Sequence, residues 1–301
     1  MTAAAIETRA LRKTYGGTVA LDGLDLHVER GEVFGLLGPN GAGKTTAVKL
    51  LLGLASPSGG DGQVLGRPLG DREVRRRIGY LPELFRYQAW LTAREVIELH
   101  ATLAGLPRTG RDAEIHRVLD LAGIASRSRD RTGGFSKGMQ QRLGLAVALL
   151  GDPELVVLDE PTSALDPVGR DDVRAIIRDA RARGSTIVLN SHLLGEVERV
   201  CDHVAVVHRG RVLAAGTLAG MLGEPAVRLR VTDLPEERSW LAPFGRLSED
   251  ADGWLAIRPL DAARVPDVVA AIVAHGGRVH AVDPGRRSLE DVFLGLVRDA
   301  P

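Results

Sequence analysis

The sequence offers little that suggests secretion or a membrane span. It contains 1 cysteine among 301 residues, Cys201, so no internal disulfide can form. Residues 1–13 lack the apolar core of a signal peptide. The longest apolar candidate, residues 143–150, is far shorter than the ~18 residues of a membrane-spanning helix. These absences favour a reducing cytoplasm, and any membrane span would have to come from another chain.

The chain also lacks net charge. Its 39 Lys and Arg residues balance 39 Asp and Glu residues, so no overall basic field draws it to nucleic acid, and we expect no nucleic-acid partner. A hydrophobic content of 44% with 26% charged residues is ordinary for a globular protein. The length allows one large domain and a small one.

The most informative segment is residues 38–45, Gly-Pro-Asn-Gly-Ala-Gly-Lys-Thr, which fits the G-x-x-x-x-G-K-[ST] pattern in full. Residues 32–37 resemble a buried strand that enters this loop, and residues 45–54 resemble a helix that leaves it. The N–H groups of residues 41–45 would face phosphates at the positive end of the helix dipole. We expect Lys44 to reach the outer phosphates and the Thr45 hydroxyl to bind Mg²⁺. A simple glycine-rich turn is the alternative, which the order strand, loop, helix disfavours.

A second segment, residues 155–160, has four apolar residues followed by Asp159 and Glu160. It resembles a central parallel strand that delivers carboxylates to the sheet edge where ligands bind. Asp159 would hold Mg²⁺, and Glu160 would polarise the attacking water. Taken alone, the segment could equally be a strand that ends in a solvated turn.

A third segment, residues 133–142, places Ser136 as the N-cap of a helix, which creates a second potential anion site. By itself this is more simply a capped core helix. Together with the other motifs, it resembles the signature motif of ATP-binding-cassette (ABC) ATPases. Tyr15 resembles the family's adenine-stacking aromatic, residues 163–166 its dimer-contact loop, and His192 its switch histidine. The resemblance covers about residues 6–220.

The resemblance implies ATP and Mg²⁺ as cofactors, with Glu160, His192 and Lys44 in catalysis. It assigns Thr45, Asp159 and Glu83 to the metal. It also implies a dimer in which a second copy adds Ser136 and Gly138 to each nucleotide. The expected nucleotide contacts are Tyr15, Gly38, Asn40, Gly41, Gly43, Lys44, Thr45, Thr46, Ser136 and Gly138.

Two positions depart from the family pattern. Lys137 and Met139 stand where glycine and glutamine are usual, so only Ser136 and Gly138 carry over as phosphate contacts. Glu83 replaces a glutamine, and its extra negative charge would bind metal more strongly but repel phosphate.

The expected fold is a P-loop α/β ATPase domain over residues 1–220, with a mainly parallel core sheet, an antiparallel β part and a helical insertion at about residues 90–150. Periodicity restarts after Met221, where strands at 226–231, 253–258 and 278–282 and a helix at 262–274 predict a small α+β module over 221–301. Its end, residues 288–294, resembles drug-export ATPases of the daunorubicin-resistance type, and Ser288 fits a helix start.

The resulting hypothesis is an ATPase subunit, peripheral at the cytoplasmic face of the cell membrane, that dimerises on ATP and powers export through a separate transmembrane permease. An importer ATPase and a non-transport nucleotide-sensing module are the alternatives. A DNA-repair ABC protein would need a long coiled coil between the motif halves, and a translation factor would usually carry two cassettes. The transported substrate cannot be deduced, because membrane helices of another chain would select it.

Overall fold

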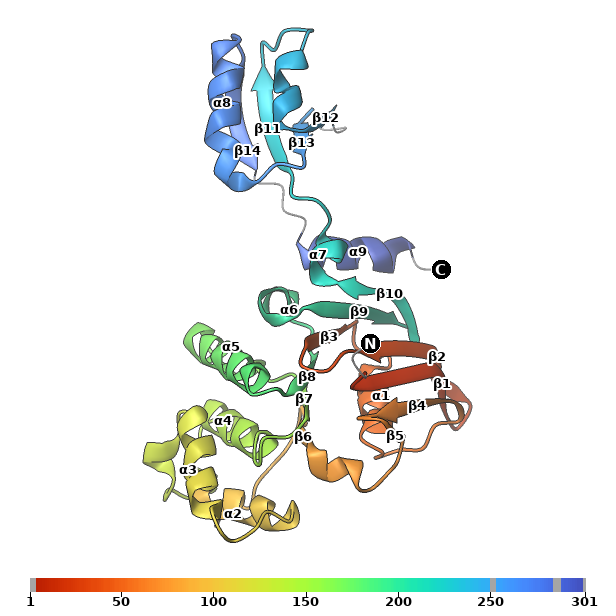
Figure 1. Ribbon diagram of the computed structural model, residues 1–301, viewed down its shortest axis with the longest axis vertical. Coiled ribbons are helices and arrows are strands. Elements are labelled where there is room, and N and C mark those ends of the chain that lie inside the picture. The colour runs from red at the N-terminus through yellow and green to blue at the C-terminus, as the bar shows by residue number, and fades with distance from the viewer. Residues whose placement is uncertain (1–3, 250–252, 284–287, 300–301) are drawn as a thin grey trace. The chain divides into compact units, whose positions relative to one another are not determined.

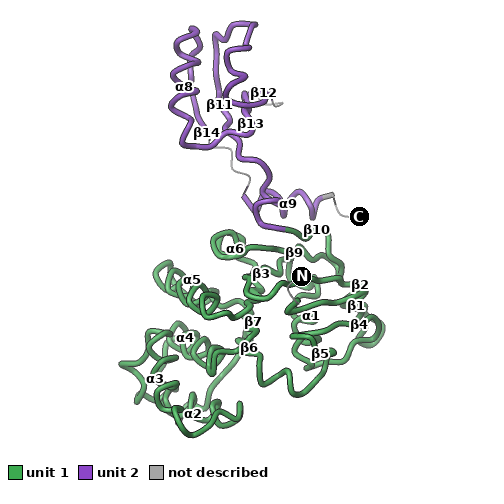
Figure 2. The backbone as a smooth tube through the Cα atoms, viewed as in Figure 1, with its two compact units in different colours: residues 1–216, 300 green, residues 217–299, 301 purple. Residues whose placement is uncertain are grey.

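The chain folds into two compact units in the computed structural model, which describes residues 4–249, 253–283 and 288–299. One unit extends to Gly216 and the other begins at Thr217 (Figure 2). The sequence-based boundary after residue 220 falls inside α7 (Leu218–Leu222).

The first unit is built around a six-stranded sheet in the order β10-β9-β3-β8-β7-β6. The four pairings that connect β9, β3, β8, β7 and β6 are parallel. Every residue of β3, β7 and β8 is buried, which agrees with the apolar residues that make up most of each strand. The strands are β3 (Val33–Leu37), β6 (Ile78–Leu81), β7 (Leu155–Asp159), β8 (Thr186–Asn190), β9 (His203–His208) and β10 (Arg211–Thr217).

An antiparallel sheet, in the order β2-β1-β4-β5, completes the β part of this unit. Helix α1 (Lys44–Leu51) buries its apolar residues in one core with side chains from both sheets. Helices α5 (Pro167–Ala182) and α6 (Leu194–Val200) pack on β8 and β3, on the opposite side from α1 (Figure 1). The strands are β1 (Ile6–Tyr15), β2 (Thr18–Val28), β4 (Gly59–Val64) and β5 (Arg67–Pro68).

A group of three helices forms the helical insertion, with a core of its own (Figure 1). It consists of α2 (Ala93–Leu103), α3 (Arg111–Leu121) and α4 (Lys137–Ala148), which contact one another. Thr92 and Glu95 form a capping box at the start of α2. Ser136 caps α4 by accepting a hydrogen bond from the Met139 N–H at 3.2 Å, as predicted.

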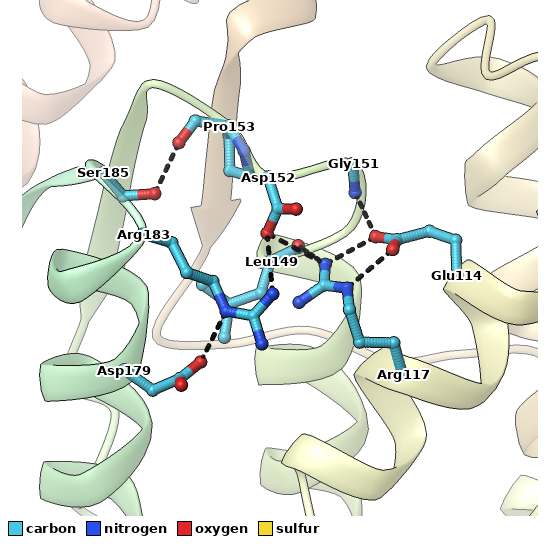
Figure 3. A network of polar contacts seen from close by, with 9 residues as sticks. All are labelled: Glu114, Arg117, Leu149, Gly151, Asp152, Pro153, Asp179, Arg183 and Ser185. Carbon is cyan, nitrogen blue, oxygen red and sulfur yellow. Dashed lines mark hydrogen bonds and ion pairs between the residues drawn. The ribbon is translucent and has the colours of Figure 1, made fainter.

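A polar network connects α3 of this insertion with the loop before β7 and with α5 (Figure 3). Glu114 accepts two hydrogen bonds of 2.6 Å from the Arg117 guanidinium and one of 2.6 Å from the Gly151 N–H. These bonds lower the pKa of Glu114, although burial opposes the shift. Arg117 also lies 3.2 Å from Asp152, which is 3.9 Å from Arg183. Helix α3 of the insertion is thereby attached to the loop that precedes β7.

The second unit is a four-stranded antiparallel sheet, in the order β12-β13-β11-β14, that shares one apolar core with α8. Its elements confirm the predicted small α+β module, and Ser288 caps the last helix. Strand β12 and helix α7 were not predicted. The elements are α7, β11 (Val227–Thr232), β12 (Arg246–Glu249), β13 (Leu255–Arg258), α8 (Val265–Ala274), β14 (Arg278–Asp283) and α9 (Leu289–Asp299).

The position of α1 between two sheets makes its apolar residues sensitive to truncation. Leu50 is fully buried, whereas Leu54, just beyond the helix, is 60% exposed. We predict that Leu50→Ala lowers the free energy of unfolding by about 2–5 kcal/mol, because it removes buried methyl groups and leaves a cavity. Leu54→Ala should change it by less than about 0.5 kcal/mol. Urea denaturation of both variants provides the measurement, and equal effects would contradict this packing.

Candidate active site

The glycine-rich loop leaves β3 and leads into α1, as predicted. Lys44 is buried, and its Nζ donates hydrogen bonds to the carbonyl oxygens of Gly38 at 2.7 Å and Pro39 at 3.2 Å. Within the described part of the chain, the N–H groups of Gly43, Lys44 and Thr45 donate to no protein acceptor. The loop therefore presents free donors at a helix start, which is the chemistry that binds phosphate.

Two glycines of this loop are required by close contacts. Gly43 has a φ of +105°, and a Cβ there would lie 2.5 Å from the Ala20 carbonyl oxygen. A Cβ at Gly38 would lie 2.3 Å from the Val207 carbonyl oxygen. Any side chain at either position would displace backbone, so the loop can keep this path only with glycine.

The acidic end of β7 lies beside the end of β8. Asp159 is paired in register with Asn190, whose Nδ2 donates to Asp159 Oδ1 at 2.5 Å. Both residues are buried. The parallel pairing therefore places the Asp159 carboxylate and the Asn190 amide together at the carboxyl edge of the sheet.

Glu160 follows β7 in a left-handed backbone conformation, with a φ of +52°. Its N–H donates to the Asn190 carbonyl at 2.8 Å. Its Oε1 accepts a hydrogen bond from the His192 N–H at 2.9 Å and lies 2.7 Å from His192 Nδ1. A non-glycine residue in this region costs about 1–3 kcal/mol and persists only where its surroundings hold it. His192, in the segment after β8, provides part of this stabilisation through its contacts with the Glu160 carboxylate.

These groups meet in one cleft of about 430 Å³. Most of the predicted site residues line it: Asn40, Gly41, Gly43, Lys44, Thr45, Thr46, Glu83, Asp159, Glu160 and His192. Ala42, within the loop segment whose N–H groups were expected to face phosphates, also lines it, as do Asn190 and Ala20, which sequence reasoning missed. Asn190 could have been found, because a polar residue that ends an apolar strand beside β7 must reach the same edge.

Four predicted residues do not line the cleft. Gly38 contacts the site only through its carbonyl oxygen, which Lys44 binds. Ser136 and Gly138 lie at the start of α4. Tyr15 is 47% exposed at the end of β1, where Lys13 Nζ lies 4.8 Å from its ring centre.

The cleft carries an excess of negative charge. Burial raises the pKa of Asp159 to about 6, and the carboxylates of Glu83 and Glu160 add to the shift against the opposing effects of Asn190 and Lys44. Burial lowers the pKa of Lys44, while Glu160, Asp159 and Glu83 counteract this. Three carboxylates thus face one ammonium group, an imbalance that a bound cation would relieve.

The donor set fits Mg²⁺ bound together with a phosphate ligand. Among the described residues, no three His, Cys, Asp or Glu side chains form a cluster that could hold a metal alone. Mg²⁺ normally binds through one or two carboxylates plus substrate phosphates and water, rather than in an all-protein cage. The Thr45 hydroxyl and Asp159, which line the same cleft as the free N–H groups, match that pattern.

A strand, a phosphate-binding loop and a helix beside a second strand that ends in two carboxylates define a P-loop nucleotide hydrolase. The comparisons with known proteins are more specific. The family model for ABC transporters matches residues 21–163. An uncharacterized ABC transporter ATP-binding protein of Nostoc sp. is 41% identical over 99% of this chain and 91% of its own length. The chain therefore belongs to the ABC transporter family, and it is an ATP-hydrolysing, ATP-binding subunit.

Two further relatives have functional names. The Nod factor export ATP-binding protein I of Cupriavidus pinatubonensis is 34% identical over 97% of this chain and 90% of its own length. The bacitracin transport ATP-binding protein of Bacillus licheniformis is 41% identical over 69% of this chain and 68% of its own length. A solved ATP-binding subunit of an ABC transporter, 33% identical, covers 72% of this chain and 91% of its own length with a TM-score of 0.67.

These likenesses confirm the expected family and the P-loop α/β fold. In the described part of the chain, no helix has both the length and the apolar character needed to cross a membrane.

Lys44 provides a direct test of the phosphate-binding loop. We predict that Lys44→Ala weakens ATP binding at least tenfold, because it removes the only ammonium group among the described residues that line the cleft. Lys49→Ala, which changes an exposed lysine in the same helix, should leave binding unchanged. Titration with a fluorescent ATP analogue measures both variants, and equal losses would contradict the assignment.

Proposed function

We propose that this chain is the energy-coupling ATPase subunit of an exporter and works with a separate transmembrane permease at the cytoplasmic face of the membrane. The proposal rests mainly on the contact between Glu160 and His192 beside the phosphate-binding loop, because it joins a general base and a histidine to the phosphate-binding groups in one cleft. The direction of transport is inferred from the Nod factor export relative, which is similar over almost the whole chain, including the second unit.

ATP would bind with its phosphates on the loop. The free N–H groups of Gly43, Lys44 and Thr45 and the Lys44 ammonium would bind phosphate oxygens. Asn40, Gly41 and Thr46 complete the rim of the cleft. Thr45, Asp159 and Glu83 would hold Mg²⁺, whose charge neutralises the phosphate oxygens. Tyr15 offers an exposed ring face for adenine.

Glu160 is positioned to act as the general base. Its carboxylate would take a proton from water as the water oxygen bonds to the γ-phosphorus and the bond from that phosphorus to the ADP oxygen breaks. His192 directs its N–H and Nδ1 toward Glu160 Oε1, which leaves Nε2 available for the γ-phosphate. Glu160 and His192 thus form a pair in which His192 both orients the base and approaches the transferred group.

A second copy of the chain would complete the site. Ser136 and Gly138 lie at the start of α4 and do not line the cleft of their own chain. A helix N-terminus is a natural phosphate ligand. We therefore propose that these residues of one copy bind the γ-phosphate held by the other, so that hydrolysis removes a contact that holds the dimer together.

Glu160→Gln separates hydrolysis from binding. We predict that this variant lowers kcat by about 10²–10⁴, the range of a lost general base, and keeps ATP affinity. It should accumulate as an ATP-bound dimer, which gel filtration with and without ATP detects. Normal phosphate release by this variant would remove Glu160 from the mechanism, and a monomer at saturating ATP would contradict the dimer proposal.

A groove of about 440 Å³ beside the helical insertion is the proposed docking surface for the permease. Its walls include Phe85, Tyr87 and Leu103, and Leu103 is 72% exposed. Leu84 and Trp90, in the segment between β6 and α2, are also largely exposed. Exposed apolar side chains of this kind mark contact surfaces. We infer that an apolar intracellular segment of the permease binds here.

The groove proposal predicts a specific loss. Leu103→Asp should reduce copurification with the permease at least tenfold, because it places a charge in an apolar contact, while phosphate release by the isolated subunit stays unchanged. Leu54→Asp changes an exposed leucine outside the groove and serves as the control. Undiminished copurification of the Leu103 variant would exclude the groove as the docking surface.

A further inference from the structure

A buried glutamine that does not line the cleft contacts the backbone of the general base. Gln141 lies on α4, is 5% exposed, and donates from Nε2 to the Pro161 carbonyl oxygen at 3.0 Å and to the Glu160 carbonyl oxygen at 3.4 Å. It is absent from the residues that line the cleft. Its contacts therefore reach the site only through the main chain of residues 160 and 161.

These two carbonyls belong to the turn in which Glu160 adopts its left-handed conformation. The Glu160 carbonyl has other donors, since the N–H and Oγ of Ser163 bind it at 3.3 Å and 3.1 Å. The Pro161 carbonyl is different: across the described residues, Gln141 is its only hydrogen-bond donor. A buried carbonyl that loses its only partner is unfavourable, so removing this amide would favour another path for the turn.

The other constraints on Glu160 do not replace this one. The Asn190 carbonyl accepts a hydrogen bond from the Glu160 N–H, and the His192 N–H donates to the Glu160 carboxylate. Both contacts come from β8 and the segment that follows it. Gln141 acts from α4, on the C-terminal side of the Glu160 backbone. A residue in a strained conformation needs such support on each side to keep its carboxylate in place.

We propose that Gln141 is a positioning residue that holds Glu160 in register for proton abstraction. The proposal rests on the role assigned to Glu160 above. Because Gln141 acts through the turn and not on the nucleotide, it governs the rate of the chemical step and leaves nucleotide affinity alone. A buried glutamine that only satisfied its own polar atoms would instead affect stability.

The first experiment measures steady-state hydrolysis by Gln141→Met, an unbranched replacement of similar length that cannot donate. We expect kcat to fall about tenfold or more, because small displacements of a catalytic group are costly, with KM for ATP and binding of a fluorescent ATP analogue unchanged. Gln140→Met is the matched control. Gln140 is the preceding residue of the same helix, and its Nε2 contacts the Phe135 carbonyl at 3.4 Å, away from the turn. It should keep normal kcat.

The second experiment is a double-mutant cycle with Glu160→Gln. If Gln141 acts through the carboxylate of Glu160, adding Gln141→Met to Glu160→Gln should not lower the residual rate further. An additional fall of the same size as in the wild-type background would overturn the proposal, as would normal kcat in Gln141→Met alone. A parallel loss of nucleotide binding would also overturn it, because that result indicates a general structural role.

Folding is checked by thermal denaturation. Should Gln141→Met unfold, Gln141→Asn retains an amide that is too short to reach Pro161 and is expected to show the same split between kcat and KM. Unfolding of both variants would reject positioning in favour of a structural role. Normal hydrolysis by Glu160→Gln would refute the role of Glu160 itself, whereas an inactive Glu160→Gln with a normal Gln141→Met refutes only the present proposal.

Discussion

The parallel pairing of β3, β8 and β7 is the constraint on which the site depends. This pairing brings the ends of three buried strands to one edge, where the first continues into the phosphate-binding loop and the second ends at Asn190. The third ends at Asp159. Backbone hydrogen bonds between the strands fix the register, and the register places these polar residues beside one another. A slip of one residue along β7 would turn the Asp159 carboxylate to the other face of the sheet and would break its pairing with Asn190.

Charge imbalance gives this edge its chemistry. Glu83, Asp159 and Glu160 lie around the one ammonium group of the buried Lys44, and burial raises the pKa of the Asp159 carboxyl to about 6. The folded protein alone does not balance these charges. Nucleotide phosphates would find free N–H donors on one wall, and a cation would find oxygen ligands on the other. Glu83 strengthens the acidic side in a place where the family usually has a neutral amide.

Most of the fold could be predicted from the sequence, because its strongest signals are local. Apolar runs indicated β3 and β7, and the caps Ser136 and Ser288 indicated helix starts. Strand β12 was missed because Arg-Leu-Ser-Glu shows little apolar alternation. Helix α7 was missed because five residues are too few to show a helical period.

The site was predictable only where a motif or a strand end marks a residue. The phosphate-binding loop is identified by its motif, and Asp159 and Glu160 are identified by their position at the end of an apolar strand. The left-handed backbone of Glu160 and its contacts with His192 and Gln141 depend on segments far apart in the sequence, so no local pattern shows them. The sequence of the helix that contains Gln141 predicts only a capped helix packed in the core. The role of a buried glutamine in such a helix can be identified only when the positions of the neighbouring carbonyl groups are known.

The polar network at the start of β7 has a consequence for ionic strength. Its inner pair, Glu114 and Arg117, is about one-fifth exposed, whereas Asp152 and Arg183 are 53% and 40% exposed. Dissolved salt screens exposed charges far more than sheltered ones. The attachment of the helical insertion is therefore graded: concentrated salt weakens the outer ion pairs that Asp152 forms with Arg117 and Arg183, whereas the hydrogen bond from the Gly151 N–H to the sheltered Glu114 carboxylate keeps α3 fastened to the loop that precedes β7.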